Sequence, residues 1–532
     1  MIVKENNFMK RKKLILNALI LTSTTMAVSF ITMGFRVYLS NKIGTEGMGL
    51  YQLLMSIHMM AATLAISGIR VTTTRLIAEE LGRKNYKKIN SIMKKAFIYS
   101  LFFSLITTYL VFSNADIIAT SWIGDKRAII PLKILSCSLP FFGIGACFHG
   151  YFYGMRKIIK SVTSDIVEIS TLMLIICSLI SFALPKGLNY TCILITLATS
   201  LSVIISTIYC YIMYIFEKKN LNKTSYSRGE KCSLFEISRI SIPIASSAYI
   251  QTGLRTLEDI LIPNALRMYG SSTSGSLSIF GLIKGMVMPL LNFPSMFLAS
   301  FSTLIIPEIA EANALNQKKR VNSIISRVFK FTLLIAVFST GLFMIYSNEL
   351  GMAIYNNTEV GFMLRILAPL IPFMYLDRIV DGSLNALDQQ MSTLKYNLID
   401  MSIRIFLILF LIPKKGIDGF IIVLFTGTLL NSLLSINRLL KVTKLEFLLF
   451  DWIIKPGICV TISSYITKTL FNIFRASSLV FLEVILIIFV YCILLLVFGA
   501  IKKSDISWFV DAFKKEINTE KISDLGLYKN IY

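Results

Sequence analysis

Fourteen apolar segments, each long enough to cross a lipid bilayer, run through this chain of 532 residues. A membrane-spanning helix needs about 20 mostly apolar residues, and its backbone polar groups are all satisfied within the helix. With 55% hydrophobic and only 16% charged residues, the composition excludes a string of soluble domains. We therefore predict an all-α polytopic membrane protein. Its predicted spans lie near residues 14–39, 48–77, 92–113, 129–152, 162–184, 190–216, 237–262, 276–306, 328–347, 361–386, 396–413, 417–437, 450–471 and 478–501.

The first apolar segment has the form of a signal peptide but not its length. The segment Met9–Lys13, with four basic residues, precedes an apolar stretch from Leu14 to Leu39, which is too long for a signal core and long enough to span. We expect it to be a retained first helix. The segments at 48–77 and 276–306 are long enough to include an interfacial turn.

The charge distribution predicts the orientation of these helices. The chain has 54 Lys+Arg against 30 Asp+Glu, a net charge of +24. In a soluble protein this excess would suggest nucleic acid, but here the basic residues lie in short segments between apolar runs. If the N-terminus is cytoplasmic, the inside segments carry roughly 35 Lys+Arg and the outside loops about 8. We predict that both termini are cytoplasmic and that nucleic acid is not a partner.

An internal repeat at a constant offset of 232 residues is the most informative pattern. It holds without a gap from about Gly44 to Ser170, across four predicted helices. An offset of an even number of helices preserves orientation, so the copies are predicted to be parallel repeats, as in transporters that rock around a central site. The alternative is a structural duplication without transport. Matching pieces include Lys87–Ile92 with Lys319–Ile324, Gly49-Leu50 with Gly281-Leu282, and Pro140-Phe141 with Pro372-Phe373.

The repeat also suggests a domain organisation. We expect two six-helix lobes, one from each copy, followed by two additional helices. The predicted parts are an N-lobe at 1–216, a cytoplasmic linker at 217–236, a C-lobe at 237–440, two further spans within 441–501, and a cytoplasmic tail at 502–532.

Charged residues within the spans are the first place to look for function, because a charge at mid-bilayer costs roughly 2.5–3.5 kcal/mol on insertion scales. Arg36 lies near the outer end of the first helix and Arg70 toward the inner end of the second, where each either faces a cavity or extends to the headgroups. Lys284 lies deeper, five residues before Pro289, and its counterpart one repeat earlier is Gln52. We expect Lys284 to face a cavity.

The predicted helix at 237–262 carries both signs of charge. Arg255 is three residues from Glu258 and four from Asp259, so either acid can share a helix face with the arginine. One interpretation is an internally neutralised pair. The other is that the acids couple transport to protons or contribute to a polar cavity with Gln52.

Other intramembrane polar residues favour structural roles. Asp400 is four residues before Arg404, which allows pairing, and Asp165 and Glu168 lie at the equivalent place in the first copy. A lone histidine in an apolar run is more often a hydrogen-bonded core residue than a proton relay, which we expect for His58 and His149.

The chain shows no catalytic motif. It has no phosphate-binding glycine loop followed by Lys-Ser/Thr, only 2 histidines, and 8 scattered cysteines without a Cys-x-x-Cys pair. We predict no enzymatic activity, no cofactor and no metal site. A transporter of this kind would draw on an ion gradient, the membrane potential or a partner.

Two motifs carry a family resemblance. Asn41–Gln52, which reads NKIGTEGMGLYQ, and Arg75–Glu80, which reads RLIAEE, follow the first two helices. Together with fourteen predicted helices, they resemble the polysaccharide-flippase branch of the multidrug/oligosaccharidyl-lipid/polysaccharide exporters, a superfamily that includes the MATE transporters. The resemblance spans essentially the whole chain, includes sporulation-type members, and extends to the MurJ-type lipid II flippases.

This resemblance implies a V-shaped, two-lobed transporter with a central cationic cavity. Its cargo would be an undecaprenyl-pyrophosphate-linked sugar, moved from the cytoplasmic to the outer leaflet. Lys284 takes the place of an arginine of the MurJ branch, and Arg36 matches a second one. Phe30 stands where that branch has a further arginine, and Tyr51 and Gln52 lie where it has an acidic residue.

For sporulation-type members the implied role is peptidoglycan synthesis for the spore cortex, with lipid II as the cargo. The implied partners are a lipid-linked oligosaccharide, membrane lipids and cell-wall synthases. Cationic side chains would compensate the pyrophosphate in a cavity of low dielectric constant, so the residues expected to bind cargo are Arg36, Lys284, Arg70 and Arg255.

Two other functions stay open. A cation-coupled small-molecule antiporter of the multidrug type would place a membrane-embedded acid in a lobe cavity. A non-transporting scaffold for cell-wall synthesis would leave Arg36 and Lys284 dispensable.

Overall fold

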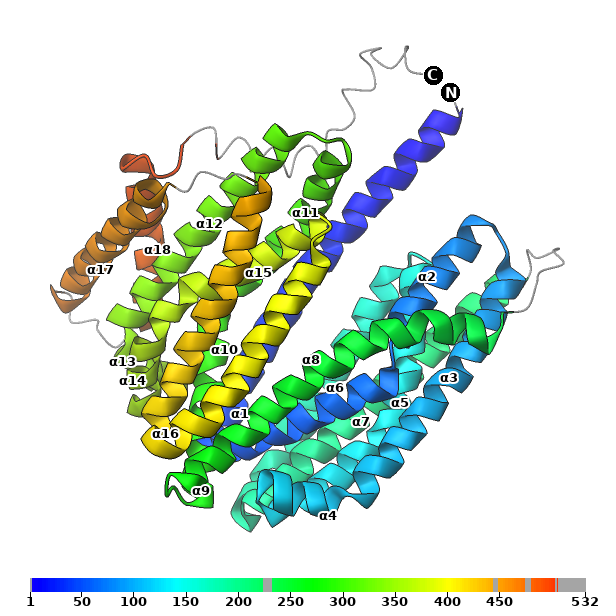
Figure 1. The fold of residues 1–532 in the computed structure, drawn as a ribbon, viewed down its shortest axis with the longest axis horizontal. Coiled ribbons are helices and arrows are strands. Elements are labelled where there is room, and N and C mark those ends of the chain that lie inside the picture. The colour runs from blue at the N-terminus through cyan, green and yellow to red at the C-terminus, as the bar shows by residue number, and fades with distance from the viewer. Residues whose placement is uncertain (1, 223–231, 444–447, 474–479, 503–504, 506–532) are drawn as a thin grey trace. The chain divides into compact units, whose positions relative to one another are not determined.

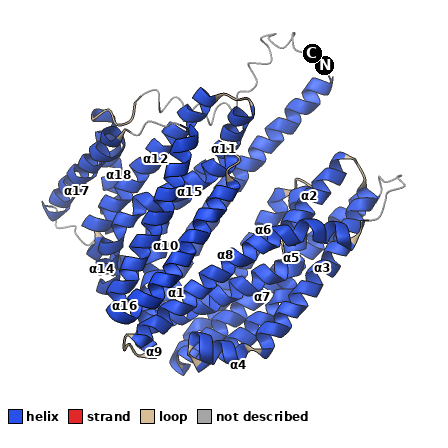
Figure 2. Ribbon diagram, viewed as in Figure 1, coloured by secondary structure: helices blue, strands red, loops and turns tan. Residues whose placement is uncertain are grey.

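The structure, a computed structural model, describes residues 2–222, 232–443, 448–473, 480–502 and 505. Within these residues all regular structure is helical (Figure 2), which confirms the predicted all-α class. Ten helical stretches of the described chain are long and apolar enough to cross a membrane, so the chain is a multi-pass membrane protein. The count of fourteen stays a prediction. Most of the predicted tail and residues 223–231 of the linker lie outside the described residues.

The chain divides into two compact units, each with its own packing. Unit 1 comprises residues 1–27, 291–393 and 432–532, and unit 2 comprises residues 28–290 and 394–431. Grouping by packing and grouping by the 232-residue repeat are therefore different partitions of the chain.

Unit 2 is built around α5, which packs against α2, α3 and α7, while α6 packs against α7 (Figure 1). Phe148 and Tyr151 of α5 form the centre of its core, together with Phe97 and Tyr214. The elements with residues in this unit are α1 (Ile2–Ile66), α2 (Ile69–Gly82), α3 (Tyr86–Ser113), α4 (Ala115–Ile117), the π-helical η1 (Ile118–Ile123), η2 (Lys126–Ala128), α5 (Ile129–Gly154), α6 (Ile158–Ala183), η3 (Leu184–Lys186), α7 (Leu188–Asn222), α8 (Leu234–Met268), α9 (Thr273–Phe280), the π-helical η4 (Gly281–Val287), α10 (Met288–Asn292) and α16 (Gln390–Thr443).

Unit 1 is organised around α12, which contacts α11, α15 and α17, and α17 in turn packs on α18. Tyr346, at the end of α12, is fully buried and donates a hydrogen bond to Glu483 of α18 over 2.9 Å. The elements of this unit are α11 (Ser295–Ala314), α12 (Lys318–Ile345), α13 (Ser347–Tyr355), α14 (Thr358–Leu367), η5 (Ala368–Leu370), α15 (Ile371–Ala386), η6 (Phe450–Ile454), α17 (Lys455–Ile473) and α18 (Val480–Val497), with the ends of α1, α10 and α16.

The two longest helices each contain a sharp break at a glycine. In α1 the break is at Gly44 (φ 70°), and in α16 it is at Gly416 (φ 57°). Glycine adopts a positive φ without the steric penalty of a Cβ atom. Each break falls between two predicted spans, so α1 and α16 are each long enough to cross the membrane twice.

The backbone follows the predicted repeat. α3 and α12 begin and end 232 residues apart, as do the C-terminal ends of α5 and α15. Residues with a left-handed backbone also recur at this offset, in the pairs Lys84 and Asn316, Gly124 and Asn356, and Arg156 and Asp388. A positive φ is uncommon outside glycine, so its recurrence at one offset shows that the two copies share their turns as well as their helices.

Within unit 2 the two copies touch at an equivalent glycine. A Cβ atom added to Gly49 would collide with the backbone of Leu277, and one added to Gly281 would collide with the backbone of Thr45 and Gly49. Only glycine permits this backbone approach between α1 and the segment formed by α9 and η4. The crossing brings the second half of α1 beside Lys284.

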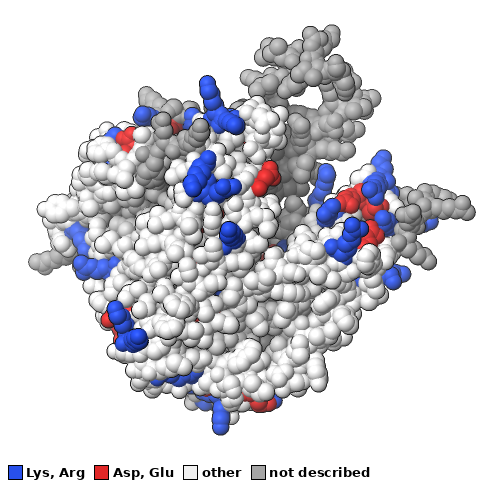
Figure 3. Space-filling model, in the orientation of Figure 1, with Lys and Arg blue, Asp and Glu red and all other residues white. Residues whose placement is uncertain are grey.

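The outward faces of the helices are apolar, as expected for contact with lipid. On α6, Leu174 is 72% exposed and Phe182 is 73% exposed. Large apolar side chains exposed in this way are unfavourable in water but not against hydrocarbon. On the face shown in Figure 3, most of the described surface is likewise free of charged residues.

Candidate functional site

Two adjacent acids of α8 form the centre of the candidate site. The helix begins after Ser233, whose side chain accepts a hydrogen bond from the backbone N–H of Phe235. Glu258 is buried in its middle, with only 8% of its side chain exposed, and Asp259 is 16% exposed. Carboxylates at such depth are costly unless a cation or several hydrogen bonds compensate them.

Lys284 supplies the first compensating charge. Its Nζ lies 2.9 Å from Glu258 Oε1 and 3.2 Å from Asp259 Oδ1. The lysine sits in the middle of the π-helical segment η4. A π-helical turn inserts an additional residue into the helix, changes the direction of neighbouring side chains, and is frequent at functional sites. Lys284, which the sequence places deep within a predicted span, therefore lies on the irregular backbone of η4.

Arg404 of α16 supplies the second charge. Its Nε lies 2.9 Å from Asp400 Oδ2, four residues earlier, and its Nη1 lies 4.0 Å from Glu258 Oε1. Gly427, further along α16, leaves the space that the guanidinium group fills, because a Cβ atom there would overlap Arg404 Nε. The arginine thus extends from one carboxylate on its own helix toward another on α8.

The second half of α1 adds polar contacts to α8. Ser56 Oγ donates a 2.8 Å hydrogen bond to Asp259 Oδ2, and Thr256 Oγ1 donates to the carbonyl of Ser56 over 3.1 Å. Gln52 lies one turn before Ser56 on the same helix face. Its Oε1 is buried and has no hydrogen-bond partner among the described residues. An unsatisfied buried amide oxygen is costly and needs an explanation.

We name this group of ionised residues the charge cluster: Glu258, Asp259, Lys284, Asp400 and Arg404. All five residues belong to unit 2. Three carboxylates face two cations here, so the described cluster carries one more negative charge than positive charge. It combines the predicted Lys284, Glu258 and Asp259 with a pair that the sequence suggested only as structural.

The other predicted cavity cations form no ion pair with the acids of the cluster. Arg255 is exposed, and the acids three and four residues away pair with Lys284 instead. Arg36 is half-buried in α1. Arg70 is exposed, with its guanidinium over the ring of Tyr153 at 5.3 Å. None of these three arginines forms an ion pair with a described residue, and their role in cargo binding stays a prediction.

The side chains of both histidines are largely buried. His58 is 5% exposed and packs edge-on against Phe142. His149 Nδ1 is hydrogen-bonded to Ser161, and its Nε2 lies 3.9 Å from Asp165 Oδ1. The described residues contain no group of three or more His, Cys, Asp or Glu side chains that could hold a metal ion.

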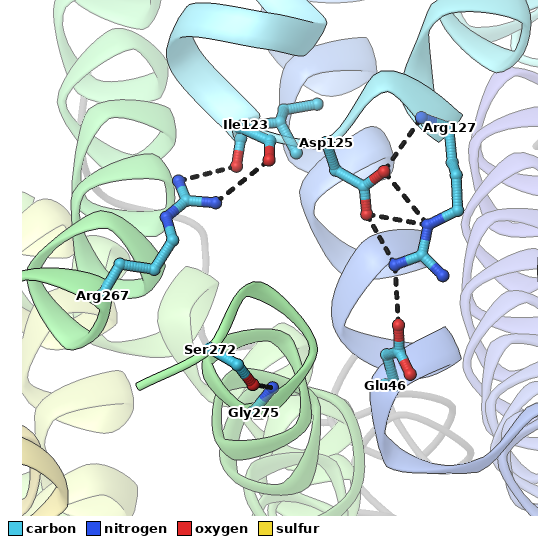
Figure 4. A network of polar contacts seen from close by, with 8 residues as sticks. Glu46, Ile123, Asp125, Arg127, Arg267, Ser272 and Gly275 are labelled. Carbon is cyan, nitrogen blue, oxygen red and sulfur yellow. Dashed lines mark hydrogen bonds and ion pairs between the residues drawn. The ribbon is translucent and has the colours of Figure 1, made fainter. Parts of the chain in front are cut away.

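A second polar group, the outer-end network, lies at the end of unit 2 that the charge distribution predicts to face outside (Figure 4). Arg127 forms ion pairs with Asp125 and with Glu46 of α1, the latter over 2.6 Å. Arg267, at the end of α8, donates to the carbonyls of Ile123 over 2.8 Å and Gly124 over 3.3 Å. Asn264 donates to the carbonyl of Trp122 over 2.9 Å. The network ties the end of α8 to the loop after η1.

Sequence reasoning found Lys284 but not its partners. Spacing along one helix suggests which residues share a face, and it pointed to Arg255. The actual partners of Lys284 are Glu258 and Asp259, which both lie on α8, and only the helix packing brings them beside the lysine. From the sequence, the charged residues of the outer-end network are expected only as loop charge. Its one local signal is the Asp125 side chain, which accepts from the backbone N–H of Arg127 as a helix cap does.

Comparison with known proteins places the fold. The lipid II flippase MurJ in its inward closed conformation aligns with a TM-score of 0.63 at 16% identity, over 90% of this chain and 98% of that one. An inward-facing multidrug resistance MATE family transporter of the MOP superfamily aligns with a TM-score of 0.61 at 12% identity, over 81% of this chain and 99% of that one. At these identities the likeness shows the fold alone, and it confirms the predicted MATE-like architecture.

Sequence comparison reaches further. Stage V sporulation protein B of Bacillus subtilis (strain 168) is 25% identical over 94% of this chain and 98% of its own length. Sporulation protein YkvU of the same organism is 22% identical over 63% of this chain and 74% of its own length. These relatives confirm the resemblance drawn from the two motifs. The family model described as polysaccharide biosynthesis protein matches residues 14–311, more than half of the sequence, and the chain belongs to this family.

Proposed function

We propose that the chain is a flippase that moves an undecaprenyl-pyrophosphate-linked glycan across the cytoplasmic membrane by alternating access. Lipid II for spore cortex peptidoglycan is the specific cargo we propose. Support comes from the membership of the polysaccharide biosynthesis family, from a relative along nearly the whole chain that is named for sporulation, and from a fold relative named as a lipid II flippase.

The observation that carries the proposal is the position of Lys284. A lysine in the interior of a membrane span, on an irregular π-helical segment, is a functional site by default. A pyrophosphate needs fixed cations where water is scarce, and an ammonium group offers three donors to it. Lys284 therefore has both the depth and the chemistry to receive the head group.

Cargo binding at Lys284 would be an exchange of anions. In the structure the ammonium is held by Glu258 and Asp259 at 2.9 and 3.2 Å. A pyrophosphate must replace these carboxylates, so the empty site keeps its cation compensated and does not leave a bare charge in the membrane. This arrangement favours an anionic cargo that binds reversibly.

The test is flipping of fluorescent lipid II by the full-length protein in proteoliposomes. Lys284→Ala should reduce outer-leaflet exposure of the lipid at least tenfold, and Lys284→Arg should retain much of it. Lys414→Ala, which removes an exposed lysine beside the break in α16, is the matched control and should flip as the wild type does. Unchanged flipping by Lys284→Ala would contradict the assignment.

A cation-coupled antiporter is the second candidate, and the excess of carboxylates in the charge cluster favours it. On that function Glu258 or Asp259 would take up a coupling cation, and transport of small organic cations would depend on them. Uptake of a cationic dye into inverted vesicles separates the two. Dye transport that Glu258→Gln abolishes, with no flipping of lipid II, would favour the antiporter.

We also propose that both termini are cytoplasmic, that lobes 1–216 and 237–440 are the bodies that move against each other, and that cell-wall synthases use the delivered cargo. The charge asymmetry of the loops supports the orientation. Protease accessibility of tags placed at each end, in intact cells and in inverted vesicles, tests it. If the chain were a scaffold without transport, Lys284→Ala would leave synthase recruitment and spore cortex formation unchanged.

A further inference from the structure

Release of Lys284 creates an electrostatic problem on α8. When its ammonium turns toward a cargo, Glu258 and Asp259 lose their nearest cation. Asp259 keeps the hydroxyl of Ser56 at 2.8 Å. Glu258 is the more buried of the two, with 8% of its side chain exposed, and an uncompensated carboxylate there is strongly unfavourable.

The structure contains a second cation aimed at the same oxygen. Lys284 Nζ and Arg404 Nη1 approach one atom, Glu258 Oε1, at 2.9 Å and 4.0 Å. A shift of about 1 Å would bring Arg404 into hydrogen-bond distance of this oxygen. Lys284 and Arg404 are therefore alternative partners of a single carboxylate, and the lysine occupies it in this conformation.

Arg404 is also built to serve two acids. Its Nε is fixed on Asp400 at 2.9 Å while its Nη1 extends toward Glu258. The planar guanidinium group presents several donors in a rigid fork, so it can keep one carboxylate while it binds another. Gly427 leaves the room in which the group lies. A lysine at position 404 would have neither the fork nor the reach to both acids.

We propose that Arg404 is a positioning residue that takes over Glu258 when Lys284 turns to the pyrophosphate of the cargo. This handover rests on the proposed function. It makes the cost of freeing Lys284 small, and Arg404 itself does not touch the cargo. Without Arg404, Lys284 stays on Glu258 and the cargo has no cation to bind.

The experiment measures binding of farnesyl pyrophosphate and of inorganic pyrophosphate to the purified full-length protein by calorimetry. In Arg404→Gln the affinity for farnesyl pyrophosphate should fall at least tenfold. In the double variant Glu258→Gln/Arg404→Gln the affinity should return to within about threefold of the wild type, because a neutral side chain at position 258 needs no cation when Lys284 leaves it. A merely structural role of Arg404 would not be rescued by the loss of Glu258.

Two further variants keep the proposal testable if Arg404→Gln folds poorly. Gly427→Ala keeps the arginine and displaces its guanidinium group, and it should weaken binding about threefold. Arg75→Gln is the matched control, because Arg75 forms an ion pair with Glu79 at the same spacing but on an exposed face. It should bind like the wild type.

The outcomes separate the two proposals. Wild-type affinity in Arg404→Gln, or no recovery in the double variant, would overturn the handover while leaving the flippase intact. If the wild-type protein and Lys284→Ala bind both probes equally, the proposed cargo site itself is wrong. Binding of farnesyl pyrophosphate but not of inorganic pyrophosphate, with the Arg404 pattern above, would support the handover and show that the prenyl chain contributes to recognition.

Discussion

The charge cluster and the outer-end network are both made of ion pairs between segments that are far apart in the sequence, yet they differ in burial and in charge balance. In the cluster, Glu258 and Asp400 are each 8% exposed and three acids face two cations. In the network, Asp125 is 7% exposed but its partner Arg127 and Glu46 are about one-third exposed, and Arg267 binds backbone carbonyls rather than acids.

This difference separates two kinds of ionic contact in one membrane protein. Breaking a buried pair leaves a charge that water cannot reach, so its members must be exchanged rather than separated. A half-exposed pair opens at little cost, since water solvates both partners. The cluster is therefore suited to an exchange of ionic partners, as the proposed cargo binding requires, and the network to holding helix ends together.

The largest effect is expected from Lys284→Ala. Loss of the ammonium leaves Asp259 with only the hydroxyl of Ser56 and should lower the free energy of unfolding by about 3–5 kcal/mol, even though Arg404 can move onto Glu258. Thermal unfolding in detergent measures the change. Arg255→Ala, which removes an exposed cation from the same region, is the comparison and should leave the unfolding temperature nearly unchanged. If both variants lowered the unfolding temperature equally, Lys284 would contribute no more to stability than an exposed cation.

Removal of all three charges should undo most of that loss. In Glu258→Gln/Asp259→Asn/Lys284→Met the buried charges are replaced by neutral groups of similar size, which is often neutral or stabilising. We expect an unfolding temperature near that of the wild type, together with lost flipping. A variant that regained flipping would show that the cluster serves stability alone.

In the outer-end network the expected effect is smaller. Arg267→Ala removes two hydrogen bonds to carbonyl groups and should cost about 1–2 kcal/mol. Ser276, which is fully buried in α9, can be replaced by cysteine in a background without the exposed native cysteines. Labelling by a membrane-impermeant thiol reagent should then rise several-fold in Arg267→Ala. Lys126→Ala, in the same loop, serves as the control and should not change the labelling rate.

Salt should affect the two regions to different extents, and this is the smallest effect. The Debye length shortens from about 10 Å at 0.1 M to about 3 Å at 1 M salt. The pair of Arg127 with Glu46 should weaken by less than about 1 kcal/mol when salt is added. This salt effect should be absent in Glu46→Gln. Stability differences caused by Glu258→Gln should hardly depend on salt. If the stability difference caused by Glu258→Gln depended strongly on salt, water and ions would have access to the cluster.

The sequence was sufficient for the fold class and for naming Lys284, Glu258 and Asp259 as candidate site residues. The repeat could be predicted because similar residues recur at one offset, as in Gly49-Leu50 and Gly281-Leu282, whereas the shared turn at Lys84 and Asn316 has different residues and is seen only in the backbone. Lys284 stood out because a charge in an apolar run is conspicuous. Arg404 could not be assigned to Glu258, because helix packing decides which faces meet, and the packing depends on close approaches such as that at Gly49. The network escaped notice because its main acceptors are backbone carbonyls, which every residue carries.

The contact of Gly49 with Gly281 has one more consequence. The two glycines are the same position in the two copies of the repeat, so one sequence element meets itself. In oligomers this is the mark of an isologous interface, where a residue on a two-fold axis faces its own equivalent. At this contact the chain thus has the geometry of a homodimer interface, in which equivalent residues face each other. In such a dimer one substitution would have altered both sides of the contact at once; in the fused chain each glycine can be changed alone.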